Sequence, residues 1–155
     1  MEELAGVFKL ERKLSLTSLN LASNPKCKPQ AIATLLNSLA SNSAVPISRL
    51  VLNNNDMEVS KKTNVVVYQK LTKAIISLLS NGKFLTQLSL ANCEIGKEVM
   101  LSIGEGLFKN TKLQSLNMRG NRVKMNGIKE FVRSCFQNSK LALKHVDFSQ
   151  NQLCD

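Results

Sequence analysis

The residues best suited to chemistry gather near the carboxyl end of the chain. The only histidine, His145, stands two residues before Asp147, and Ser115 and Asn117 occur at the same spacing earlier in the chain. Side chains two apart on a strand share a face, so adjacent parallel strands would bring a Ser-His-Asp set together. Such a set activates a hydroxyl only with a sharp nucleophile turn, oxyanion donors and a pocket. The sequence signals none of these, so we predict no catalytic residue and instead a polar cluster with an ion pair between Arg119 and Asp147.

Metal and cofactor chemistry also lack their usual patterns. The four cysteines are widely separated and form no CxxC pair, whereas a structural zinc site takes four ligands at paired spacings. The glycines on either side of Glu105 match no nucleotide-binding fingerprint. We therefore predict no metal, no cofactor, and four free thiols at Cys27, Cys93, Cys135 and Cys154.

The elements that must position these side chains are five copies of one motif, LxxLxLxxN/CxL. The copies begin at Leu16, Ile47, Leu85, Leu113 and Leu143, which gives periods of 31, 38, 28 and 30 residues. In each copy the two apolar residues of LxL flank one that points the other way, because strand side chains alternate between faces. Each motif therefore predicts a short strand with core-facing apolar residues, followed by a turn.

Helix-like stretches lie between the motifs, and Pro29, Gly96 and Gly127 stand at the starts of three of them. Apolar residues at helical spacing predict which side chains point inward. These are Ile32, Leu35, Leu36 and Leu39; Val67, Leu71, Ile75 and Leu78; Val99, Ile103 and Leu107; and Phe131, Val132, Cys135 and Phe136. The extra length of the 38-residue period is expected at residues 59–66, as a loop or a longer helix start.

The polar position that closes each motif predicts a ladder of hydrogen bonds. A buried amide where the chain leaves the strand can bond the backbone of its own coil and of the neighbouring coil. The predicted members are Asn24, Asn55, Cys93, Asn121 and Asn151. Cys93 would be a structural substitute, because a thiol buried in apolar surroundings is inert.

These motifs resemble the ribonuclease-inhibitor-like class of leucine-rich repeats, to which ribonuclease inhibitor, the Ran GTPase-activating protein and NOD-like receptor arrays belong. The resemblance covers residues 7–153. It implies an α/β solenoid of right-handed strand-helix coils, with a parallel sheet on the concave face and helices on the convex face. We expect a single domain, 1–155, of about five repeats. Because both terminal coils are incomplete, we also expect an excerpt of a longer array, with ends that can associate.

The leading functional hypothesis is a non-catalytic protein-protein interaction scaffold within a larger intracellular leucine-rich-repeat protein. Two alternatives are a regulatory array that stimulates a small GTPase and the ligand-sensing array of an innate immune receptor. Nothing beyond the repeat consensus matches either, so no site residue is carried over. The candidate partner-binding residues are outward-facing strand and turn positions: Arg49, Asn53, Asn117, Arg119, His145 and Asp147.

The charge balance suggests the chemistry of the partner. The chain has 21 lysines and arginines against 11 acidic residues, a net charge of +10. Few of these cations occupy strand positions, so we predict a basic convex side and rim that suits a protein partner with an acidic surface. Nucleic acid is disfavoured, because no aromatic residue interleaves the lysines for base stacking. No apolar run approaches the ~18 residues of a membrane span and no secretory signal is visible, so we predict a cytoplasmic location.

Overall fold

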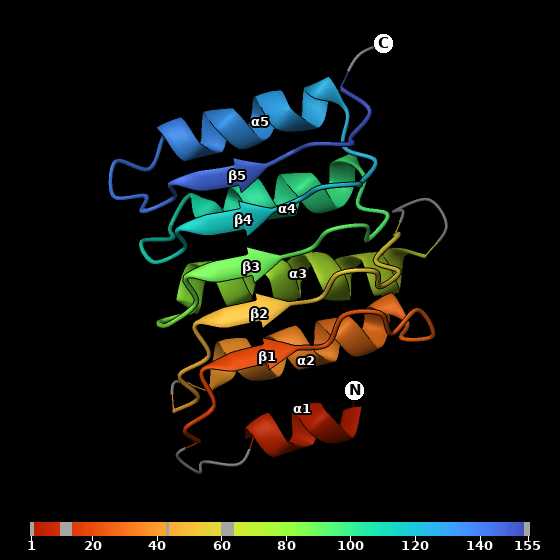
Figure 1. Ribbon diagram of the computed structural model, residues 1–155, viewed down its shortest axis with the longest axis vertical. Coiled ribbons are helices and arrows are strands. Elements are labelled where there is room, and N and C mark those ends of the chain that lie inside the picture. The colour runs from red at the N-terminus through yellow and green to blue at the C-terminus, as the bar shows by residue number, and fades with distance from the viewer. Residues whose placement is uncertain (1, 10–13, 43, 60–63, 154–155) are drawn as a thin grey trace.

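The computed structural model describes residues 2–9, 14–42, 44–59 and 64–153. Within these ranges helices and strands alternate along the chain (Figure 1). The strands are β1 (Ser18–Asn20), β2 (Arg49–Val51), β3 (Gln87–Ser89), β4 (Ser115–Asn117) and β5 (His145–Asp147). The helices are α1 (Glu2–Lys9), α2 (Pro29–Ser41), α3 (Val65–Asn81), α4 (Lys97–Leu107) and α5 (Met125–Phe136).

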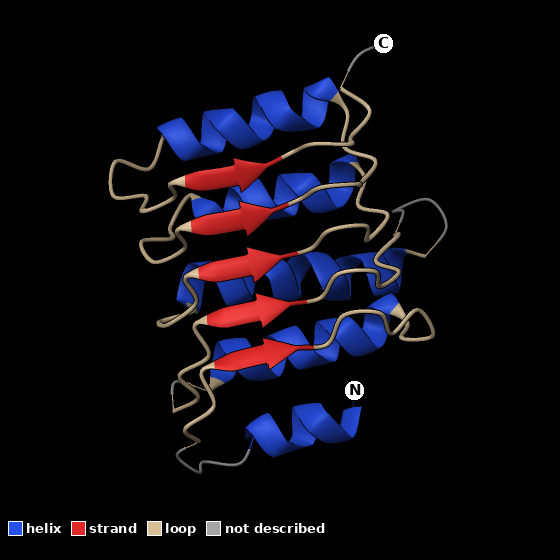
Figure 2. Ribbon diagram, viewed as in Figure 1, coloured by secondary structure: helices blue, strands red, loops and turns tan. Residues whose placement is uncertain are grey.

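The strands form one parallel sheet in the order β1-β2-β3-β4-β5. In the view of Figure 2 the helices lie behind the sheet, so one face of the sheet is open and the other is covered. Each helix runs back against the direction of the strands. Helix ends and strand starts therefore share one edge of the stack, while strand ends and helix starts share the other. The predicted strand-helix solenoid is confirmed.

One apolar residue at the centre of each strand points into the core. Leu50, Leu88 and Leu116 pair in register with their neighbours across the sheet and are at most 4% exposed. The equivalent Leu19 in β1 is half-buried, and Val146 in β5 is 38% exposed. The two end strands have a neighbour on one side only, so burial of the same motif position depends on having a coil on both sides.

The turn after each strand contains a residue with a left-handed backbone, and the turn after β3 contains a second, Glu94. All have φ between 53° and 67°; the others are Ser23, Asn54, Asn92, Gly120 and Gln150. Asparagine and glycine adopt this conformation more readily than other residues. At Gly120 a Cβ atom would also collide with Oδ1 of Asn92. The equivalent turns adopt this conformation with serine, asparagine or glutamine, so the space beside Asn92 is what favours glycine at position 120.

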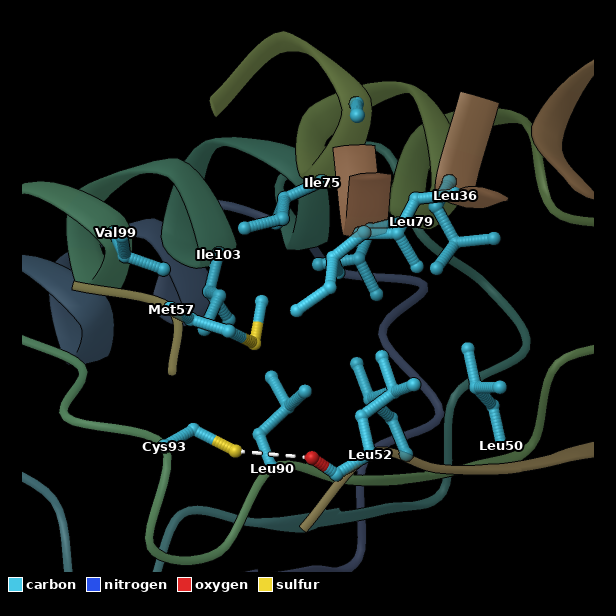
Figure 3. Packing of buried hydrophobic residues seen from close by; sticks show 14 of the residues in the cluster. Leu36, Leu50, Leu52, Met57, Ile75, Leu79, Leu90, Cys93, Val99 and Ile103 are labelled. Carbon is cyan, nitrogen blue, oxygen red and sulfur yellow. Dashed lines mark hydrogen bonds between the residues drawn. The ribbon is translucent and has the colours of Figure 1, made fainter. Parts of the chain in front are cut away.

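The apolar residues between the sheet and the helices form one continuous core (Figure 3). The predicted inward sets of α2, α3 and α4 are largely confirmed: most of their members are at most 5% exposed, while Leu39 and Val67 are half-buried. α3 begins at Val65, with the side chain of Asn64 accepting a hydrogen bond from the amide of Val67. Residues 60–63 of the expected insertion lie outside the described residues.

The predicted inward set of α5 is partly wrong. Phe131 is buried and stacks edge-on against Phe148, with ring centroids 5.4 Å apart. Val132, however, is 38% exposed and Phe136 is 86% exposed. Val132 occupies the place that Gly104 has in α4, where the helix faces the next helix along the stack. No described helix follows α5, so apolar periodicity alone overestimated its burial.

Candidate protein-interaction surface

The open face of the sheet brings together some of the predicted partner-binding residues. Ser115 pairs with His145 and Asn117 pairs with Asp147 across β4 and β5, as the strand motif predicts. These four line a shallow depression of about 410 Å³. Arg49 lies on β2, two strands away, so the candidate residues do not form one compact site.

Two of the candidate residues already have a structural role. Oδ1 of Asn117 accepts a hydrogen bond from the amide of Arg119 at 3.0 Å, and Oδ1 of Asp147 accepts one from the amide of Ser149 at 2.8 Å. The side-chain and backbone hydrogen bonds from Ser149, assisted by the charge of Arg119, lower the pKa of Asp147. Both side chains thus stabilise the turn that leaves their own strand.

Asn53 accepts the equivalent turn hydrogen bond, but from the turn of the neighbouring strand β3 and not from its own. Ser89 stands in register with Asn117, but the amide two residues after it is bonded by Asn53 instead. Oδ1 of Asn53 accepts from the amide of Ala91 at 2.9 Å and from Oγ of Ser89 at 2.7 Å. Asn53 therefore ties the coil of β2 to the coil of β3 rather than standing free for a partner.

The expected ion pair between Arg119 and Asp147 is absent from the described residues. Nε of Arg119 instead donates to Oε1 of Gln150 at 3.1 Å. The side chains of Arg119 and Asp147 are both exposed, and an ion pair between exposed side chains contributes little to stability. A hydrogen bond from Arg119 to the nearby turn residue Gln150 can therefore replace it. Arg49 and His145 are exposed and make no hydrogen bond or ion pair with another described side chain.

The residues of the predicted ladder bridge successive coils along the strand-end edge. Nδ2 of Asn121 donates to the carbonyls of Leu90 and Met118 at 2.8 Å each, and its Oδ1 accepts from the amides of Cys93 and Ile95 at 3.0 Å each. Asn55 and Asn151 likewise donate to the preceding coil and to their own, whereas Asn24 is exposed and bonds only its own coil. Oδ1 of Asn55 is buried without a partner among the described residues.

Cys93 takes the ladder position in the third coil. Its thiol donates to the carbonyl of Leu52 at 3.1 Å, the bond drawn in Figure 3, and to that of Ala91 at 3.4 Å. Burial raises the pKa of Cys93 to about 11, and burial also raises that of Cys135 to about 11. Both thiols are therefore protonated at neutral pH and poor nucleophiles.

A second set of asparagines, which the sequence reasoning missed, bridges the coils at the opposite edge. Nδ2 of Asn42 donates to the carbonyl of Phe8 at 2.7 Å, Nδ2 of Asn110 to that of Leu79 at 2.6 Å, and Nδ2 of Asn138 to that of Leu107 at 2.8 Å. We call these three residues the helix-end asparagines. The recurrence of asparagine just after each apolar helix pattern was the signal available in the sequence.

The same edge carries a run of exposed lysines. Its described connections are residues 44–48, 82–86, 108–114 and 137–144, which contain no Asp or Glu (Figure 1, left side). We call their cations the lysine edge: Lys83, Lys109, Lys112, Lys140 and Lys144. The opposite edge is mixed, since Glu58 and Glu94 both pair with Arg122 there.

Aromatic residues do accompany the lysines at this edge. Phe84 follows Lys83 and is 42% exposed, and Phe108 precedes Lys109 and is 45% exposed. The expectation that no aromatic residue interleaves the lysines is therefore wrong here. Among the described residues, no helix is long and apolar enough to cross a membrane, and no cluster of three His, Cys, Asp or Glu residues could hold a metal ion.

Comparison with known proteins agrees with this geometry. A leucine-rich-repeat family model matches residues 109–132, and no curated protein sequence matches the chain. The solved structure of leiomodin-1 actin-binding site 2 is similar over 99% of this chain, with a TM-score of 0.53 and 18% sequence identity. The chain spans 64% of the length of that structure. The chain therefore has the leucine-rich-repeat fold.

Proposed function

We propose that this chain is a non-catalytic protein-interaction scaffold whose lysine edge binds partners with an acidic surface. The lysine edge carries the proposal, because five exposed cations lie in connections that contain no carboxylate side chain. None of the five forms an ion pair with a described residue. Protein surfaces with a concentration of one charge sign attract and orient partners of the opposite sign.

The helix ends at this edge do not neutralise the lysines. All five helices, α1 to α5, end there, and the carboxyl end of a helix acts as about −0.5 of an elementary charge. Five such ends amount to about −2.5, against five positive charges. The positive charge of the lysines therefore exceeds the partial negative charge of the helix ends, and this excess supports a role in binding.

The open face of the sheet is a weaker candidate for the main contact. The oxygens of Asn53, Asn117 and Asp147 are engaged within the solenoid. We propose that Arg49 and His145, which are not so engaged, make secondary contacts. Nothing in the comparisons favours stimulation of a small GTPase or sensing in an innate immune receptor.

The likeness to leiomodin-1 actin-binding site 2 supports a protein as the partner. At 18% identity the likeness concerns the fold alone, so actin is not the proposed partner. We also propose that the chain belongs to a longer repeat array. That proposal is supported by the partly exposed apolar side chains of Val132 and Val146 at the last coil.

Selection of displayed twelve-residue peptides on the immobilised chain tests the charge preference. We expect the selected peptides to be rich in Asp and Glu, and their affinity to fall as salt rises through the ~0.1 M range in which surface charges are screened. Selection of neutral or basic peptides, or affinity that does not change with salt, would contradict the proposal.

Two matched charge reversals locate the surface. Lys109→Glu with Lys112→Glu alters the lysine edge, and Lys129→Glu with Arg133→Glu alters the exposed face of α5. We expect the first pair to slow association with the selected acidic peptides and the second to have a smaller effect. A larger effect of the second pair would place the contact on the helices, as the sequence first suggested. A GTP hydrolysis assay with small GTPases is the control for catalysis, since stimulation by the chain would overturn the scaffold role.

A further inference from the structure

The helix-end asparagines share one arrangement at three of the four described crossings between neighbouring helices. Each donates Nδ2 to a carbonyl near the end of the preceding helix, and each accepts at Oδ1 from the amide two residues ahead of it, at 2.8 Å for Asn42, 2.9 Å for Asn110 and 3.0 Å for Asn138. The amide side chain thus fills the space between two successive helix ends.

The crossing from α2 to α3 lacks this arrangement. Asn81 ends α3, but its Nδ2 donates to Oγ of Ser77 on its own helix at 3.3 Å, and its side chain is exposed. Gly82 follows it and has no side chain. A Cβ atom there would collide with the carbonyl oxygen of Leu78. The backbone at this crossing therefore excludes the side chain that fills the other three.

A second substitution enlarges the same space. Two residues before their asparagines stand Phe108, just after α4, and Phe136, at the end of α5; the equivalent positions in α2 and α3 are the small Ala40 and Ser80. Ala40 and Gly82 both line a cleft of about 380 Å³ between the ends of α2 and α3. The cleft thus lies where two small residues meet at one crossing, whereas the crossing beside Ser80 keeps the side chain of Asn110.

The lining of the cleft is mixed: Ser41, Asn42 and Asn81 contribute polar groups beside the apolar side chains, and Lys83 contributes one positive charge. Leu39, Val45, Ile47 and Leu78 contribute aliphatic side chains to the lining, and partly exposed Phe84 adds an aromatic ring. Its volume falls within the range of pockets that bind ligands, which is about 300–1,000 Å³.

Lys83, the first member of the lysine edge, is the only charged residue among those that line the cleft. The next lysines along the same edge, Lys109 and Lys112, continue the positive charge beyond it.

We propose that this cleft anchors a partner by one bulky apolar side chain, a leucine or phenylalanine, that stands next to acidic residues in an extended segment. The apolar lining would bury the side chain, and Lys83 would pair with a neighbouring carboxylate. Anchors of this kind, placed in a desolvated pocket and surrounded by weaker polar contacts, supply most of the affinity in protein interfaces. The inference rests on the proposed function and names the place and chemistry of the contact.

The test uses three fluorescein-labelled twelve-residue peptides and the full chain, with binding measured by fluorescence anisotropy. The first is an acidic peptide with a central phenylalanine, the second replaces that phenylalanine by alanine, and the third keeps it in a neutral sequence. We expect the first to bind at least about tenfold more tightly than either of the others.

Two variants locate the binding. Ala40→Phe should narrow the cleft, because Ala40 lines it, and should weaken the phenylalanine peptide about tenfold while leaving the alanine peptide unchanged. Phe84→Ala serves if Ala40→Phe does not fold, and should also weaken only the phenylalanine peptide. Leu101→Ala, at an exposed position on α4 away from the cleft, is the matched control.

The outcomes separate this inference from the proposed function. Equal binding of the two acidic peptides, or insensitivity to Ala40→Phe and Phe84→Ala, would overturn the cleft and leave the acidic partner in place. Equal binding of the neutral and acidic phenylalanine peptides would overturn the charge preference on which both proposals rest. Tighter binding of a twelve-nucleotide oligouridine than of the acidic phenylalanine peptide, with sensitivity to Phe84→Ala, would identify the ligand as single-stranded nucleic acid and overturn the peptide proposal.

Discussion

Replacement of Asn121 by leucine should strongly destabilise the solenoid. The amide of Asn121 is buried, at 4% exposure, and makes hydrogen bonds to two carbonyls and from two backbone amides. The amides of Cys93 and Ile95 have Oδ1 of Asn121 as their only acceptor among the described residues. Leucine fills a similar volume but leaves both N–H groups buried and unpaired.

The expected loss follows from those two groups. A buried donor without a partner costs about 1–3 kcal/mol, so two of them should lower the free energy of unfolding by about 2–6 kcal/mol. With a urea dependence of about 2 kcal/mol/M, the denaturation midpoint should fall by about 1–3 M. Circular dichroism at 222 nm in urea measures this directly.

Two further variants decide whether the hydrogen bonds are responsible. Asn24→Leu is the matched control, because Asn24 is exposed and bonds only carbonyls of its own coil, so its midpoint should move by less than about 0.5 M. Asn121→Cys copies the residue that occupies the ladder position in the third coil and should have an intermediate effect. If Asn121→Leu unfolds at the wild-type midpoint, or no earlier than Asn24→Leu, the reasoning about the ladder is wrong.

Two other properties follow from burial. Because burial raises the pKa of Cys93 and Cys135 from 9.0 to about 11, the folded chain keeps protons that the unfolded chain loses, and stability should fall as pH rises from 9 to 11. Urea titrations across that range check this, and Cys93→Ala with Cys135→Ala should flatten the dependence. Because Val146 is 38% exposed whereas Leu88 is 4% exposed, amide exchange should be faster in β5 than in β3. Exchange followed by mass spectrometry measures both, and equal protection would count against fraying from the last coil.

The repeat motif was enough to predict the strands, their order and their register. LxL admits one orientation with both leucines buried, and a slip of one residue would expose them. The strand motif alone therefore places Ser115 beside His145 and Asn117 beside Asp147, as the structure shows. The same reasoning failed at Phe136, because a helical pattern of apolar residues does not say whether another helix will cover it.

The sequence by itself determined the leucine-rich-repeat architecture, because the same side chains recur in each coil and fold it in the same way. Only the tertiary structure decided which polar groups are already engaged and where space is left. Asn53 proved to serve the turn of the neighbouring strand, and the cleft beside Gly82 arises from residues 40 and 82, which are far apart in the chain. Contacts between successive coils depend on the direction of each side chain and on the size of the side chain that faces it from the next coil. A motif compared one repeat at a time gives no information about either.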